Sequence, residues 1–82
     1  MNFKKVTDEL FATVTHDDLA RALGVSVATI RQARLGEEAK ARRSPPPGWE
    51  GAALRLAETR AKHFERLIGR LRVAAPAKQP NP

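Results

Sequence analysis

The chain of 82 residues contains no cysteine. Disulfides and thiolate metal sites are therefore excluded, and a core of this size is expected to supply only a few kcal/mol of net stability. The sequence also has no apolar run of about 18 residues, the length that a membrane span requires. Its first stretch, MNFKKVTDEL, lacks the apolar segment of a signal peptide. These absences predict one small, soluble, cytoplasmic domain.

Residue groupings typical of enzymes are also missing. His16 and His63 lie far apart in the sequence, and neither has a partner at metal-ligand spacing. There is no cysteine nucleophile, phosphate-binding glycine loop or GxSxG turn. Asp17 and Asp18 are better explained as charges at the start of a helix than as a catalytic pair. We therefore expect no enzymatic activity, no cofactor and no metal, and no small-molecule effector is evident.

Acidic residues are scarce in the second part of the chain. Residues 1–30 hold three basic and four acidic side chains, whereas residues 31–82 hold twelve basic and five acidic ones, which accounts for the net charge of +6. Such clustering favours a polyanionic partner, nucleic acid before an anionic membrane. A basic face that serves only solubility would have the same composition.

Strand-like alternation and internal repeats are absent, and apolar residues instead recur at helical spacing. This pattern predicts an all-α fold, in which a small helix-turn-helix domain of three short helices (1–36) precedes one long amphipathic helix (49–74). The short helices are expected over 3–13, over 16–23 and from after Ser26 to near Leu35, with Gly36 as the stop. Thr15 and Asp18 resemble a capping box for the second helix.

The stretch LARALGVSVATIRQARLG, residues 19–36, is helical in character on both sides of Gly24. A glycine inside a helix costs about 1 kcal/mol relative to alanine. Glycine readily adopts the positive φ that ends a helix, and Ser26 can then cap the next helix. The sequence therefore predicts two short helices joined by a tight turn.

The segment that follows, EEAKARRSPPPG (residues 37–48), interrupts the apolar periodicity. Consecutive prolines cannot continue a helix, so we expect a basic connector with a stiff, extended end. At the other end of the chain, the proline-rich residues 75–82 are predicted to be a disordered tail.

The long helix carries an apolar stripe along its whole length, interrupted by Arg60, which must reach water or find a partner. Its first half is expected to pack on the short helices. Its second half exceeds what a three-helix unit needs to cover, which favours a symmetric homodimer. The expected interface residues are Phe64, Leu67, Ile68 and Leu71.

Residues 16–36 resemble the helix-turn-helix of lambda-repressor and Cro-like (XRE-like) regulators, whose pattern is L-A-x-x-L-G-V-S-x-x-T-I followed by a glycine. The matching positions are Leu19-Ala20, Leu23-Gly24-Val25-Ser26, Thr29-Ile30 and Gly36. The chain departs from the family at Arg34, where many members carry an acid. It also has a proline connector and one long helix where members usually have two compact helices.

The resemblance implies a sequence-specific transcriptional regulator of bacterial or phage type, a repressor associated with the nucleoid, that binds double-stranded DNA as a homodimer. Helix 26–35 would lie in the major groove. By position, the residues at base edges would be Ser26, Val27, Ala28, Arg31 and Gln32. The expected phosphate contacts are Thr29, Arg34, Lys40, Arg42 and Arg43.

The chemistry of these side chains suits base recognition. Arg31 can donate two hydrogen bonds to guanine, Gln32 can pair with adenine, and Val27 or Ala28 can contact a thymine methyl group. Packing of Val27 against a neighbouring element remains an alternative.

Two other functions compete with DNA binding. The long amphipathic helix would also suit a helical protein interaction module. A basic helix on a membrane surface is disfavoured, because residues 45–47 and Trp49 fit a connector and a core more simply.

Overall fold

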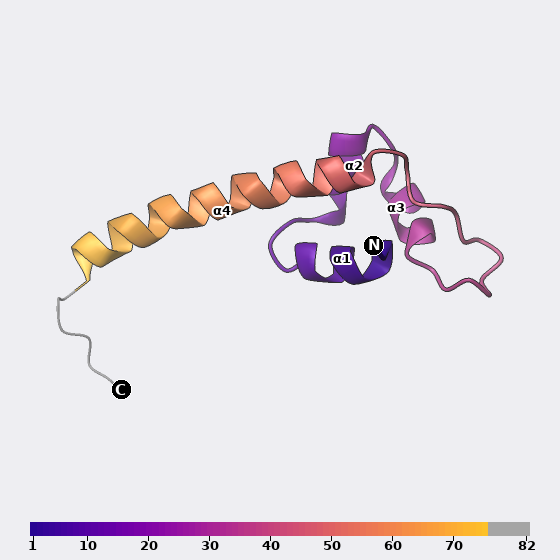
Figure 1. Cartoon of the computed structure of the whole chain (residues 1–82), viewed down its shortest axis with the longest axis horizontal. Coiled ribbons are helices and arrows are strands. Elements are labelled where there is room, and N and C mark those ends of the chain that lie inside the picture. The colour runs from indigo at the N-terminus through magenta and orange to yellow at the C-terminus, as the bar shows by residue number, and fades with distance from the viewer. Residues whose placement is uncertain (76–82) are drawn as a thin grey trace.

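The computed structural model describes residues 1–75, and all regular structure within them is helical. The helices are α1 (Phe3–Leu10), α2 (His16–Leu23), α3 (Val27–Ala33) and α4 (Trp49–Ala74). Three short helices gather around the first turns of α4, and the rest of α4 extends away from them (Figure 1). The prediction of an all-α fold with three short helices before a long one is confirmed. Of the predicted disordered tail, 75–82, all but Ala75 lies outside the described residues, and Ala75 is the C-cap of α4.

Helix α1 is shorter than predicted: it ends at Leu10, whereas the sequence predicted an end at residue 13. The N–H groups of Ala12 and Thr13 donate to the carbonyls of Glu9 and Leu10, each at 3.2 Å. Such i to i−3 bonds mark a tightened last turn. Residues 13–15 are all β-branched and disfavour a helix, which is why the chain leaves α1 before them.

Helix α2 has the bounds predicted from the sequence, and both of its caps are local. The backbone N–H of Asp18 donates to the Thr15 hydroxyl at 3.0 Å, and the Asp18 carboxylate accepts from the Thr15 N–H at 3.1 Å. Gly24 ends the helix in the left-handed conformation, with φ of +69°. Only two residues separate Gly24 from α3, so α2 and α3 are joined by the tight turn that was predicted.

Helix α3 ends at Ala33, and the prediction that Gly36 stops it is wrong. Arg34 occupies the C-cap with φ of −91° and ψ of −3°. Among the described residues, positive φ values occur at Gly24 and Gly48 and not at Gly36. The side chain of Arg34 is bonded to α1, as described below, so a tertiary contact at this residue accompanies the end of the helix.

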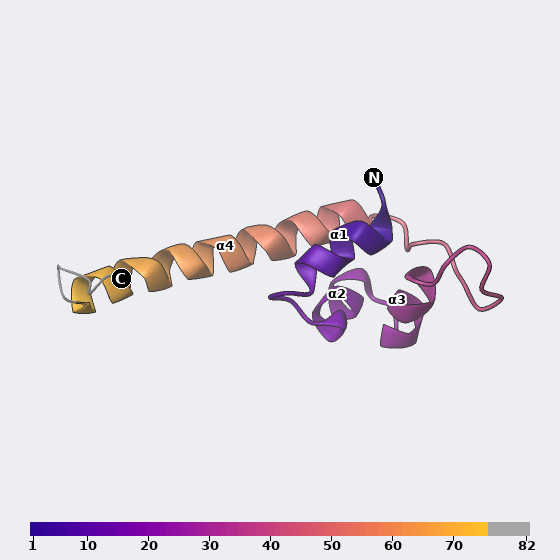
Figure 2. The same ribbon diagram turned by 90° about the horizontal axis from the view of Figure 1, so that it is seen from below.

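The core of the molecule is shared between the short helices and the first turns of α4. Apart from Pro46 of the connector, the fully or almost fully buried side chains are Phe3, Val14, Leu19, Ala20, Ile30, Ala33, Trp49, Ala52 and Ala53, together with Thr7. The Trp49 ring meets Phe3 edge to face, with centroids 5.0 Å apart. This contact joins the start of α4 to α1, and Figure 2 shows α2 and α3 on the same side of both helices.

The connector returns the chain to the core so that α4 can start there. Pro46 is buried, and its carbonyl accepts a hydrogen bond from the Trp49 N–H at 3.2 Å. Gly48 precedes Trp49 with φ of +82°, a conformation that L-residues rarely adopt. Further along α4, Arg60 forms an ion pair with Asp18 of α2 at 3.3 Å, so of the two outcomes considered for this residue it has found a partner. No described helix is both long enough and apolar enough to span a bilayer.

Candidate nucleic-acid interface

Helix α3 buries one side and exposes the other. Ile30 and Ala33 lie in the core, whereas Ala28 and Arg31 are exposed. Residues three apart lie on the same side of a helix, so Ala28 and Arg31 are neighbours on the outer face. This face of α3 therefore presents a small apolar side chain beside a guanidinium group.

The predicted residues at the start of α3 are largely occupied within the fold. Val27 is partly buried and packs against the core, as in the alternative considered for it. The Ser26 hydroxyl is exposed, accepts from the Thr29 N–H at 3.1 Å and lies 3.0 Å from the Thr29 hydroxyl. The Ser26 hydroxyl caps the helix and the Thr29 hydroxyl contacts it, so a phosphate contact by either would be additional to these bonds.

Gln32 and Arg43 are held together at the other end of α3. The Arg43 side chain donates from Nε to Gln32 Oε1 at 2.7 Å, and the Arg43 backbone N–H donates to the Gln32 carbonyl at 3.2 Å. These two bonds attach the connector to the last turn of α3. Lys40 and Arg42, both exposed, precede Arg43 in the same connector. The structure thus brings predicted base-contacting and phosphate-contacting residues together.

Arg34, expected at a phosphate, is instead directed into the molecule. Its guanidinium group donates to the Thr7 hydroxyl and to Asp8, the latter at 2.7 Å, and lies 5.1 Å from the centre of the Phe11 ring. Its side chain is only 19% exposed. Hydrogen bonds from Lys4 and then Arg34 lower the pKa of the Asp8 carboxyl. We therefore assign Arg34 to the attachment of α3 to α1.

His16, which the sequence did not indicate as part of this site, lies at the start of α2 beside the basic residues. Its ring stacks on Phe11 with centroids 3.9 Å apart. Partial burial, followed by the positive charges of Arg34 and Arg31, lowers the pKa of His16 from its ordinary value of 6.5. The sequence places His16 directly after the capping Thr15, and this position was the one signal that could have drawn attention to it. The proximity of His16 to α3, however, depends on the tertiary fold.

The lowered pKa of His16 makes stability depend on pH. The folded chain binds the His16 proton less tightly than the unfolded chain does. The contribution of neutral His16 to the free energy of unfolding is therefore complete above pH 6.5 and is lost as the pH falls through the folded pKa. We expect the free energy of unfolding to decrease as the pH drops below 6.5, and His16→Gln to flatten this dependence. Chemical denaturation at several pH values measures it, with His63→Gln as the control. An NMR titration of His16 with a midpoint above 6.5 would contradict the expectation.

The expected dimer residues lie on the part of α4 that extends beyond the core. Phe64, Ile68 and Leu71 are 42%, 46% and 56% exposed, and Leu67 is partly buried. The described chain therefore leaves an apolar face largely uncovered here.

Within residues 1–75 there is no cluster of three or more histidine, aspartate or glutamate side chains that could hold a metal ion. Comparison of the chain with protein-family models, with curated proteins and with solved structures gives no match.

Proposed function

We propose that this protein binds double-stranded DNA in a sequence-specific manner, as a transcriptional regulator of the lambda-repressor and Cro-like type, with α3 in the major groove. The observation that carries the proposal is the outer face of α3, where Ala28 and Arg31 are exposed on a helix joined to α2 by the Gly24 turn. A helix fits the major groove, which is about 12 Å wide. Two copies would read an inverted repeat, because one short helix contacts too few bases for a specific site.

The expected division of contacts follows from the exposure of each side chain. Arg31 would donate to guanine, and Ala28 would contact a thymine methyl group. The exposed Lys40 and Arg42, together with Arg43, would bind phosphates through charge alone. Arg34 is omitted from this set because its charge is paired with Asp8.

Duplex binding at several salt concentrations tests the proposal. We expect tight binding of a selected duplex, with log K falling linearly against log salt as phosphate-bound counterions are released. Neutralising Lys40 and Arg42 together, which leaves the bond between Arg43 and Gln32 in place, should weaken the binding of selected and random duplexes alike. It should also reduce the slope by about one unit for each phosphate that is no longer bound. If the wild-type protein binds no duplex at low salt, the proposal fails.

The bond between Arg43 and Gln32 alters the expected base preference. A guanidinium only donates hydrogen bonds, so the Gln32 oxygen faces Arg43 and its amide NH₂ is left for a base. Bidentate pairing with adenine needs that oxygen as an acceptor, whereas guanine N7 and O6 accept from donors alone. We therefore expect Gln32 to favour guanine in the wild-type protein, rather than adenine.

Arg43→Ala should shift the preference at this position from guanine towards adenine, because the Gln32 oxygen becomes free. The discrimination between the two bases should change by about 1–3 kcal/mol. Selection and sequencing of bound duplexes measures the preference, with Lys40→Ala as a control that removes a connector charge without touching Gln32. An unchanged preference in Arg43→Ala would show that the bond does not control recognition.

A protein interaction module is the second candidate, favoured by the uncovered apolar face of α4. Docking of a protein through this face releases no counterions from phosphates, so its affinity should not show the steep salt dependence of DNA binding. The salt titration of duplex binding therefore distinguishes the two functions.

A further inference from the structure

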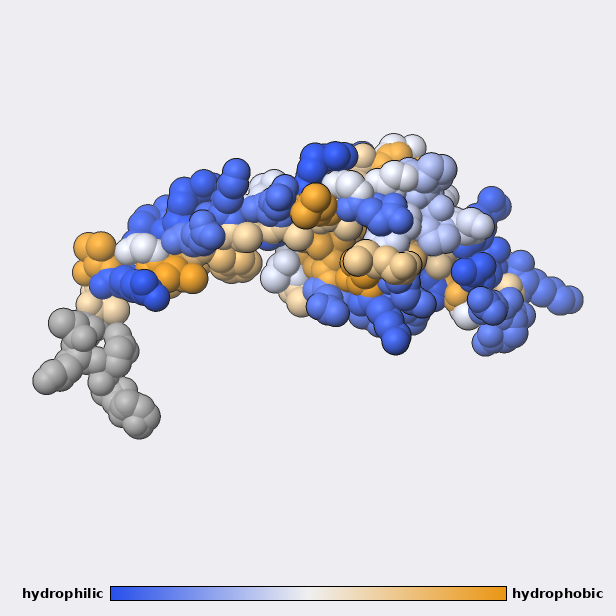
Figure 3. All heavy atoms as spheres, in the orientation of Figure 1, coloured by the Kyte–Doolittle hydropathy of each residue, from blue (hydrophilic) through white to orange (hydrophobic). Residues whose placement is uncertain are grey.

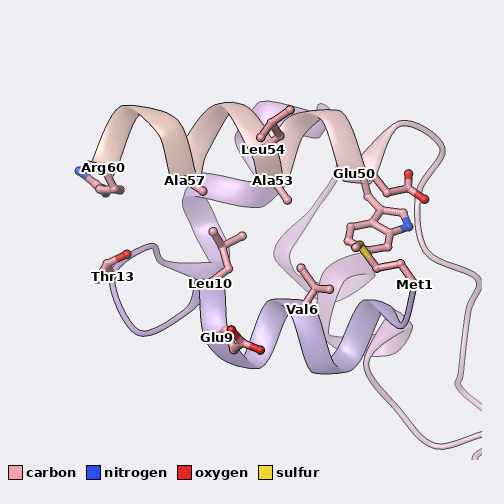
Figure 4. A pocket seen from close by; sticks show the side chains of 11 residues that line it. Met1, Val6, Glu9, Leu10, Thr13, Glu50, Ala53, Leu54, Ala57 and Arg60 are labelled. Carbon is pink, nitrogen blue, oxygen red and sulfur yellow. The ribbon is translucent and has the colours of Figure 1, made fainter. Parts of the chain in front are cut away.

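A groove of about 690 Å³ lies between α1 and the first half of α4. Val6 and Leu10 of α1 point towards α4, and Ala53 and Ala57 of α4 point back towards α1 (Figure 4). Leu54 stands at its edge and is 57% exposed. The floor of the groove is therefore apolar, and the groove is open to an apolar ligand.

The groove continues into the uncovered face of α4. At about 100° per residue, Ala53, Ala57, Phe64, Ile68 and Leu71 fall within about 60° of one another around the helix. Hydrophobic residues accordingly appear beneath the first half of α4 and again at its far end (Figure 3). One surface strip thus has a concave end, the groove, and a convex end that bears large apolar side chains.

We propose that a second copy of this chain covers the strip, with the two α4 helices antiparallel, so that the convex end of each copy lies in the groove of the other. Such an arrangement is isologous, because both copies use the same surface and no apolar end is left open. It specifies the dimer of the proposed function, but it does not require DNA binding.

Charge favours the antiparallel direction. Residues 66–74 contain Arg66, Arg70 and Arg72 and no acidic residue. Glu9 and Glu50, which line the groove, are exposed, and neither forms an ion pair within the described part of the chain. Arg60 also lines the groove, but its charge is paired with Asp18. Antiparallel helices bring the basic end of one copy to the acidic groove of the other, whereas parallel helices place like charges at the same level, which is unfavourable.

Side-chain size along α4 agrees with this direction. The exposed residues near the middle of the strip, Ala57 and Ala61, are small and permit close approach of two helices. With the two-fold axis near Ala61, Ile68 lies opposite the partner's Leu54, and Arg72 lies opposite the partner's Glu50. Large apolar residues thus meet at each end, and an ion pair closes each groove.

The absence of cysteine allows cross-linking with single-cysteine variants of the full chain. Glu50→Cys and Arg72→Cys, mixed and treated with a short bismaleimide, should give a covalent dimer in high yield, whereas Arg72→Cys alone should give little. Lys62→Cys lies on the opposite side of α4 and should not cross-link to Glu50→Cys. Cross-linking of Arg72→Cys to itself as efficiently as in the mixture would overturn the antiparallel arrangement.

Ile68→Asp provides the second measurement, because it places a carboxylate in the proposed interface without touching the core. Sedimentation equilibrium should show a monomer at concentrations where the wild-type protein is a dimer, with the helical content of the monomer retained. Val73 is 87% exposed and lies off the strip, so Val73→Asp should leave the dimer intact. A wild-type chain that is monomeric at all concentrations, or a dimer that survives Ile68→Asp, would overturn the proposal.

Discussion

Replacing Trp49 with alanine is expected to lower the free energy of unfolding by about 3–5 kcal/mol, the range for an aromatic residue removed from a core. Trp49 is only 6% exposed, and its ring contacts Phe3 with centroids 5.0 Å apart. It is the largest residue by which α4 joins the short helices. Since small domains are stable by about 5–15 kcal/mol, this one change should remove much of the stability.

Urea denaturation followed by circular dichroism at about 222 nm, a wavelength that reports helix content, measures this effect at about micromolar protein, with two-state behaviour assumed. Val73→Ala is the matched control on the same helix, because its side chain is 87% exposed and its removal should change stability by less than about 0.5 kcal/mol. Equal urea midpoints for Trp49→Ala and the wild-type protein would show that α4 does not depend on this contact.

Replacing Arg31 with alanine is expected to have the largest effect on DNA recognition. Arg31 is exposed on the outer face of α3, and no ion pair within the described residues holds its guanidinium group. Removal of a bidentate bond to guanine should cost about 1–3 kcal/mol at each half-site, and a dimer on an inverted repeat makes this bond twice. Binding of a random duplex should fall much less, because phosphate contacts dominate there.

Fluorescence anisotropy with the selected and the random duplex measures both affinities. Arg55→Ala is the matched control, because Arg55 is an exposed arginine on α4 and lies away from α3 in the sequence. It removes the same charge from the chain without altering the outer face of α3. If Arg31→Ala binds the selected duplex as tightly as the wild-type protein, and with the same base preference, α3 is not the recognition helix.

The sequence alone determined the features that depend on near neighbours. Helix α2 has its predicted bounds because its capping box and its terminal glycine act within a few residues. The long helix begins at Trp49 as predicted, shortly after consecutive prolines that cannot continue a helix. Its end at Ala74 was predicted from the apolar periodicity. The all-α class followed from the same periodicity.

The tertiary structure decided how the charged and polar residues are used. Arg34 bonds to Asp8 and Gln32 bonds to Arg43, and His16 lies near Arg31, although the members of each pair are 11 to 26 residues apart. The direction of an exposed side chain depends on which partner the fold brings within hydrogen-bonding distance, and periodicity carries no information about that. Local signals therefore placed the helices except for the ends of α1 and α3. Packing decided the rest: the contact of α3 with α1 pairs Arg34 with Asp8, and the contact of α1 with α4 determines where the groove lies.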